Sequence, residues 1–230
     1  MKRTTILILL ASLISLSVFV SAYQLSGEED IVTFEKYVDE GWNLLGGGVF
    51  ASMPASDSDI KKEDISAIYF YDNVNNKYIL MYPGTSGEAE FQAFASQVTD
   101  PAGELGSAAA WVYVKKSSSL KYTTDDFRKV DDRQLRQGWN FVSIDNSFGG
   151  KSVAQIKGNC EITKYARWAD NPTTPSNAKE WIVLSSQNEI NQIQYSAGGS
   201  YVGEGNLFYV TSNCELGSST GGIGNPPEFP

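Results

Sequence analysis

The chain has 230 residues, with 18 lysines and arginines against 27 aspartates and glutamates, and therefore a formal net charge of −9. This acidic balance argues against binding to nucleic acid or to anionic lipid, because both need a basic face. Histidine is absent, so serine and cysteine nucleophiles lack their usual imidazole base. Aromatic residues make up 12% of the chain, and the frequent Thr, Val, Tyr and Gly favour a mainly β protein with short helices.

The N-terminus predicts export. Lys2 and Arg3 precede a long uncharged segment, and the small residues Val20-Ser21-Ala22 follow it, so we expect a signal peptide over residues 1–22. An uncleaved membrane anchor is the alternative, since the apolar run is near the lower length limit of a spanning helix. In both cases the rest of the chain is secreted or at the cell surface. Without Lys2 and Arg3 it carries 16 basic and 27 acidic residues, a net charge of −11, and no further membrane segment is expected.

The first unit of the chain is expected to contain a strand, a hairpin, a short helix and a closing strand. A strand begins at Gly41-Trp42-Asn43, and residues 65–82 predict a β-hairpin in which Tyr71 lies opposite Tyr78. Because side chains alternate along strands, one face of this hairpin carries the core residues Ile68, Phe70, Ile79 and Met81. The other face carries Tyr69, Tyr71 and Tyr78, either as a second buried layer or as an exposed aromatic shelf. Helical spacing over 88–98 predicts a short helix, and 58–65 and 152–158 predict helical turns.

The same order of elements returns in the second half of the chain. Gly-Trp-Asn recurs at 138–140, and the later segments match in order: ISAIYFY (65–71) with ITKYARW (162–168), KYILMY (77–82) with EWIVLS (180–185), and AWVYV (110–114) with NLFYV (206–210). Such self-similarity indicates a tandem duplication. We expect small sandwich-like or barrel-like β units over 28–122 and 138–217, a charged connector over 123–137, and a disordered tail over 218–230. The pattern leaves open whether the units are separate domains or halves of one.

Tryptophans mark equivalent places in both units. Trp42 and Trp139 are expected to be buried structural anchors, each against the inward face of its own hairpin. In the second unit, Trp168 and Trp181 replace the tyrosine pair of the first hairpin and flank a longer loop, which favours partial exposure.

The two cysteines, Cys160 and Cys214, lie in matching Asn-Cys-Glu triplets. A disulfide is the default in an oxidising exterior. A metal site would lack histidine or further thiols as ligands, and a catalytic cysteine would lack its base. We therefore expect a disulfide within the second unit, closing a loop of about 55 residues.

Several motifs match catalytic or cofactor-binding patterns only in part. Residues 46–51 fit a dinucleotide-binding glycine pattern, but Pro54 interrupts the helix that the phosphates need. Residues 217–221 fit a serine-hydrolase elbow without any histidine. Residues 72–76 resemble a calcium loop with Val74 at a ligand position. No cofactor, metal site or catalytic residue is predicted from them.

The ordered pattern as a whole resembles a known kind of module. In the first unit the pattern consists of Gly41-Trp42-Asn43-Leu44, Tyr69-Phe70-Tyr71-Asp72, Tyr78 and Trp111-Val112-Tyr113-Val114. In the second unit it consists of Gly138-Trp139-Asn140-Phe141, Trp168, Trp181, Gly203-Glu204-Gly205 and Phe208-Tyr209-Val210. It is similar to a β-rich module of secreted archaeal and bacterial surface proteins, roughly "GWNLISLP … VWAYD … W … GKGYWV". The likeness covers most of residues 38–217, although LGSAAAW (105–111) lacks the second glycine and no proline follows GWNLL. The resemblance implies an accessory or envelope role and no shared catalytic activity.

Three functional hypotheses follow. The first is a non-catalytic secreted or cell-envelope protein of two duplicated β modules, with a binding or structural role toward a surface polysaccharide or envelope protein. The second is a carbohydrate-binding protein that stacks sugar rings on Tyr69, Tyr71, Tyr78, Trp168 and Trp181. The third is a glycoside hydrolase using two carboxylates across a cleft, for which the acidic clusters at 57–64 and 125–132 supply candidates. Burial of all five aromatic side chains would remove the support for the second hypothesis.

Overall fold

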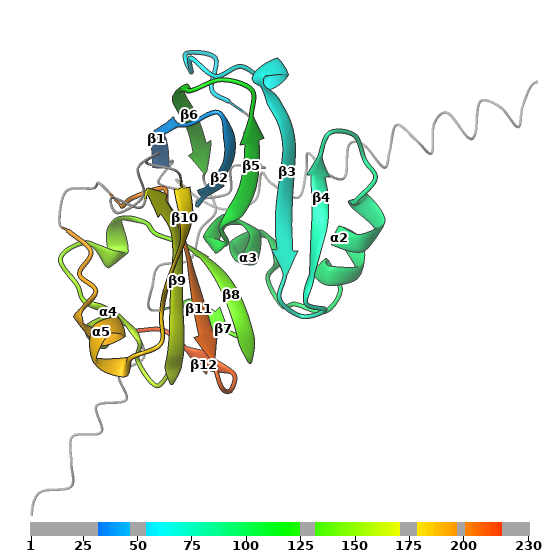
Figure 1. The fold of residues 1–230 in the computed structure, drawn as a ribbon. Helices are drawn as coiled ribbons and strands as arrows, with labels where there is room; N and C mark the ends of the chain where they lie inside the picture. Colours follow the sequence, from blue (N-terminus) through cyan, green and yellow to red (C-terminus); the bar gives the residue numbers. More distant parts are fainter. Residues whose placement is uncertain (1–31, 47–53, 125–131, 171–178, 197–200, 218–230) are drawn as a thin grey trace, which may run out of the picture. The chain divides into compact units, whose positions relative to one another are not determined.

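The computed structural model describes residues 32–46, 54–124, 132–170, 179–196 and 201–217, all of which belong to one compact unit (Figure 1). These residues are mainly β with short helices, as the composition predicts. The expected signal peptide and the expected disordered tail lie outside the described residues. Within the described ranges, no helix combines the length and the apolar character needed to cross a membrane.

The first sheet has four antiparallel strands in the order β2-β5-β3-β4. Its strands are β2 (Gly41–Leu45), β5 (Ala110–Val114), β3 (Ile65–Asp72) and β4 (Lys77–Tyr82). The predicted hairpin is confirmed, with Tyr71 opposite Tyr78 and Phe70 opposite Ile79. Its register differs from the prediction at the far end, where an irregularity next to Ile68 places that residue opposite Tyr82 instead of Met81.

The second sheet has the same strand order as the first. It contains β8 (Gly138–Ser143), β11 (Gly205–Val210), β9 (Ile162–Asp170) and β10 (Lys179–Leu184), antiparallel in the order β8-β11-β9-β10. In both sheets the Gly-Trp-Asn strand lies at one edge beside the closing strand, and the hairpin completes the other side (Figure 1).

Two short strand pairs flank these sheets. Strand β1 (Val32–Val38) pairs with β6 (Ser118–Thr124), and β7 (Gln134–Leu135) pairs with β12 (Cys214–Glu215). The connector predicted over 123–137 therefore begins and ends in strands. Alternation explains β6, because Leu120 and Tyr122 are fully buried while the residues between them are polar.

The helices are short. They are η1 (Lys62–Asp64), α2 (Glu88–Ala95), α3 (Pro101–Ser107), η3 (Asn146–Phe148), α4 (Val153–Ile156) and α5 (Gln187–Gln192). Helix α3 is not predicted by apolar spacing, but Asp100-Pro101 marks its start. The Asp100 carboxylate accepts a hydrogen bond from the Gly103 amide, and proline suits the first helical position.

Asparagine is the buried member of both Gly-Trp-Asn triplets. Each side-chain amide donates to two backbone carbonyls at the start of its strand, and the distances are the same in both copies: Asn43 to Asp39 (2.7 Å) and Gly41 (3.1 Å), and Asn140 to Arg136 (2.7 Å) and Gly138 (3.1 Å). The glycines have φ angles of 102° and 104°, where a side chain would be strained. The triplet thus specifies a tight entry into the strand, as expected for its asparagine.

The tryptophans of the triplets are not core anchors of their own sheets, contrary to the prediction. Trp42 is 41% exposed and Trp139 is half-buried. Side chains alternate along a strand, so each tryptophan lies on the face opposite the buried asparagine that follows it. The core face of the first hairpin is instead covered by other apolar side chains, with Phe70 and Ile79 packing on Phe94 of α2 and Leu105 of α3.

We expect Asn140→Ala to lower the free energy of unfolding by about 2–3 kcal/mol, because buried backbone groups lose their partners. The Asn140 side chain also accepts hydrogen bonds from the Arg136 amide at 2.9 Å and from Asn73 Nδ2 at 3.1 Å. Urea unfolding measures the change. Asn213→Ala is the matched control, since the exposed Asn213 accepts one backbone hydrogen bond, from Gln137. Equal stability of the two variants would contradict this role of Asn140.

The two sheets are packed together rather than separated by a linker. Leu44 and Ala109 from the first half contact Phe141, Ala166 and Leu207 from the second in one apolar cluster. A backbone hydrogen bond of 3.1 Å from the Ala109 amide to the Phe141 carbonyl joins the halves. The halves are therefore parts of one compact body.

The predicted disulfide between Cys160 and Cys214 is present. It ties the segment before β9 to β12, and the buried Cys160 lies in the apolar core of the second half.

Candidate functional site

Each sheet has a core face and an aromatic face, and the aromatic faces contact each other. Trp111 of β5 lies 5.4 Å, between ring centroids, from both Trp168 of β9 and Trp181 of β10. Tyr71 of β3 lies 4.6 Å from Phe141 of β8. The second aromatic layer that the hairpin pattern predicts is thus the surface where the two halves meet.

A cleft of about 420 Å³ opens between these faces. All six residues that line it are aromatic: Trp42, Tyr69, Tyr78, Trp111, Trp168 and Trp181. Tyr78 is 51% exposed and Trp181 is 38% exposed, so ring surface is available to a molecule that enters from solvent. The volume is within the range of about 300–1,000 Å³ that is typical of sites for small organic ligands.

A second cleft of about 330 Å³ adjoins the first. Its lining consists of Tyr71, Tyr78, Trp139, Phe141, Ala166, Trp181, Val183 and Leu207. Tyr78 and Trp181 line both clefts, so the two clefts lie side by side, and together they are here named the aromatic groove.

The rings at the centre of the groove fix one another. Trp111, Trp168 and Trp181 meet pairwise at interplanar angles of 80°, 84° and 70°, with centroids 5.4–5.5 Å apart. Such edge-to-face contacts are the favoured arrangement of aromatic pairs. The indole nitrogen of Trp168 also donates to the Trp42 carbonyl at 3.1 Å. The ring faces are therefore held in place before any ligand arrives, which lowers the entropy cost of binding.

The described lining of the groove is uncharged. Among the residues that the structure describes, none of those lining it carries a charged side chain. Burial raises the pKa of Tyr71 above its ordinary value, and the nearby Tyr78 and Asp72 act in the same direction, so this phenol is protonated at neutral pH. Its hydroxyl donates to Asn76 Oδ1 at 3.2 Å. The groove therefore offers flat apolar ring faces with hydroxyl and indole groups as its polar atoms.

The structure brings the five predicted stacking residues together. Tyr69 and Trp168 line the first cleft, Tyr71 lines the second, and Tyr78 and Trp181 line both. Each of these side chains is partly buried or exposed, and none is fully buried. Trp111, Phe141 and the two tryptophans of the triplets complete the groove, and the sequence reading missed them as site residues. For Trp111 a signal existed, because it alternates with the buried Ala110 and Val112.

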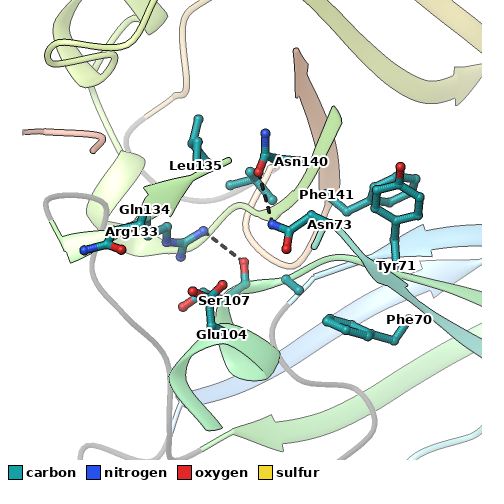
Figure 2. Close-up of a pocket in the computed structure, with 12 residues that line it drawn as sticks. Phe70, Tyr71, Asn73, Glu104, Ser107, Arg133, Gln134, Leu135, Asn140 and Phe141 are labelled. Atoms are coloured by element: carbon teal, nitrogen blue, oxygen red, sulfur yellow. Dashed lines mark hydrogen bonds between the residues drawn. The ribbon is translucent and has the colours of Figure 1, made fainter. Parts of the chain in front are cut away.

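A separate cavity lies where α3 meets the second half (Figure 2). It has a volume of about 30 Å³, which holds one or two water molecules and excludes a sugar or a nucleotide. Figure 2 shows the Asn73 side chain donating to Asn140 Oδ1 at 3.1 Å and Arg133 donating to the Ser107 carbonyl at 3.3 Å. This cavity is part of the polar contact between the halves and is too small for a ligand site.

The described acidic residues of the hydrolase hypothesis do not line the groove. Asp57 pairs with Lys121 at 2.7 Å and Asp64 with Lys116 at 2.9 Å, and these hydrogen bonds lower the pKa of both carboxyl groups. Asp132 is exposed, and residues 125–131 lie outside the described ranges. Across the part of the chain that the structure describes, no three Asp, Glu, Cys or His side chains gather into a group able to hold a metal ion.

Comparison of this chain with protein-family models, with curated proteins and with solved structures found no match.

Proposed function

We propose that this protein is a non-catalytic binding protein of the cell exterior and that the aromatic groove binds carbohydrate. The observation that carries the proposal is the first cleft, in which six aromatic side chains from both sheets line about 420 Å³ of solvent-open space. Sugar rings present C–H groups on their faces and hydroxyls on their edges. In an open groove the faces pack against indole and phenol rings while the hydroxyls stay hydrated.

Other ligands with flat rings fit the groove less well. Nucleobases also stack on aromatic side chains, but nucleic acid binding combines stacking with a positively charged groove that follows the phosphates. The described lining of the aromatic groove contains no lysine or arginine, and the whole chain has a net charge of −9. A neutral ligand with ring faces is the better match.

The location and the origin of the molecule are parts of the same proposal. The predicted signal peptide supports a place outside the cytoplasm, where polysaccharides are abundant. The shared strand order of the two sheets, together with the matching hydrogen bonds of Asn43 and Asn140, supports a duplication of one ancestral module. The resemblance to modules of secreted surface proteins supports an accessory role rather than catalysis.

We expect neutral oligosaccharides to bind and to change the tryptophan fluorescence, because five of the nine described aromatic residues that line the groove are tryptophans. Trp181→Ala should weaken binding about thirtyfold, since truncation of a central aromatic contact residue costs about 2 kcal/mol or more. Fluorescence titration and isothermal titration calorimetry with hexasaccharides of β-linked glucose and of β-linked N-acetylglucosamine measure the two effects.

Tyr37→Ala is the control for this experiment. Tyr37 is 69% exposed on β1 and lines neither cleft, so its removal should leave affinity unchanged. Thermal unfolding of both variants checks that they are folded. The proposal fails if neither sugar series binds the folded parent protein, or if Trp181→Ala and Tyr37→Ala bind equally well.

A further inference from the structure

The aromatic groove repeats itself from one end to the other. Tyr78 and Trp181, which line both clefts, occupy matching places in the two hairpins, opposite Tyr71 and Trp168 respectively. Trp42 lines only the first cleft and Trp139 lines only the second, and both are the tryptophans of Gly-Trp-Asn triplets. The two clefts thus share a pair of related residues, and each is also lined by one of the two related triplet tryptophans.

A groove that repeats is suited to a ligand that repeats. A single sugar ring needs one cleft, whereas the second cleft adds about 330 Å³ with its own indole face from Trp139. Because the clefts are adjacent and share Tyr78 and Trp181, consecutive rings of one linked chain can reach both of them. A compact ligand would leave one cleft unused.

The lining also restricts the chemistry of the rings. Uronic acids, sulfated sugars and phosphorylated sugars carry anionic groups that proteins bind with arginine and lysine. Neither arginine nor lysine occurs among the described residues that line the groove, and the acidic chain repels anions at long range. Sugars whose hydroxyls are all equatorial present C–H groups on both faces, so they can contact aromatic rings from opposite walls.

We propose that the aromatic groove binds a neutral glycan chain with equatorial hydroxyls, and that consecutive sugar rings occupy its two clefts. This inference rests on the carbohydrate-binding function proposed above. It adds the class of sugar and a requirement for chain length.

The test compares disaccharides and tetrasaccharides of β-1,4-linked glucose and of β-1,4-linked N-acetylglucosamine by isothermal titration calorimetry. The tetrasaccharide of at least one series should bind about tenfold or more tightly than its disaccharide, since it gains the contacts of the second cleft. An acidic tetrasaccharide of galacturonic acid should bind at least about tenfold more weakly than the neutral one.

Two variants assign the clefts. Trp42→Ala removes a ring from the first cleft, and Val183→Asp places a charge at the second cleft, where Val183 is 55% exposed and tolerates a polar side chain. Both variants should weaken tetrasaccharide binding about tenfold, whereas only one of them should weaken disaccharide binding. Tyr37→Ala again serves as the control outside the groove.

The outcomes separate this inference from the function on which it rests. Equal affinity for the disaccharide and the tetrasaccharide would overturn the chain-binding model while leaving carbohydrate binding intact. The same conclusion would follow if Trp42→Ala and Val183→Asp each lowered the affinity for both lengths equally. Tight binding of the galacturonate probe would overturn the neutral class. Failure of every sugar to bind the folded protein would remove the proposed function and this inference together.

Discussion

Asp145→Ala is expected to lower the free energy of unfolding by about 3–5 kcal/mol, the usual cost of removing one partner of a buried ion pair. The Asp145 carboxylate and the Arg133 guanidinium are both buried and bonded to each other. Arg133 also donates to the carbonyls of Ser143 and Ser107, and its guanidinium lies 4.9 Å from the centre of the Phe148 ring. Without Asp145 this buried cation loses the carboxylate to which it is hydrogen-bonded.

The pKa of Arg133 reflects two opposing effects, the burial of the cation and the nearby negative charge of Asp145. Burial lowers its pKa, and the negative charge of Asp145 acts in the opposite direction. Because the pair joins Ser107 of α3 to the β8 end of the second half, its loss should weaken the contact between the halves as well as the second half itself.

Urea unfolding of Asp145→Ala beside Asp57→Ala tests this expectation. Asp57 pairs with Lys121 at the surface, where solvent screens the charges, so its removal should change stability little. The double variant Arg133→Met with Asp145→Leu should recover much of the loss, because apolar side chains replace a buried pair without leaving a lone charge. A change below about 1 kcal/mol in Asp145→Ala would contradict a stabilising role of the pair.

Removal of the disulfide is expected to lower the free energy of unfolding by about 4 kcal/mol in the chain-entropy description. Cys160 and Cys214 are 54 residues apart in sequence, and opening this loop gives the unfolded chain more freedom. The loop contains β9, β10 and β11, so the loss should act first on the second sheet and on its groove residues Trp168 and Trp181.

The double variant Cys160→Ala with Cys214→Ala, unfolded in urea beside the oxidised parent protein, measures the effect. Alanine suits the buried position of Cys160 and avoids a new polar group there. Reductant should destabilise the parent and leave the variant unchanged. Alkylation of two thiols in the parent without reductant would show that the bond does not form in solution.

The local pattern of the sequence predicts much of each sheet. Alternation in residues 65–82 gives the hairpin, the opposition of Tyr71 and Tyr78, and the burial of Phe70 and Ile79. The predicted export signal and the count of two cysteines together predict the disulfide, which the structure contains. These features depend on neighbours in the chain or on composition, so they are readable without knowledge of the fold.

Part of the groove was predictable for the same reason. The second face of each hairpin carries Tyr69, Tyr71, Tyr78, Trp168 and Trp181, and alternation alone places them away from the core. Trp42 and Trp139 were assigned to the core because a large aromatic residue at a strand start is usually buried. Their strands instead present the buried asparagine to the core side and the indole to the other side.

The sequence by itself thus determined the strands of the two four-stranded sheets, the faces of the hairpins and the covalent link between Cys160 and Cys214. The tertiary structure alone decided what covers the aromatic faces. Trp111 meets Trp168 and Trp181, and Arg133 meets Asp145 and Ser107, through the packing of one half on the other. Alternation shows that a strand has two faces, but it carries no information on which distant surface lies against each. The aromatic groove exists because two such faces meet incompletely, and that depends on the shapes of both halves together.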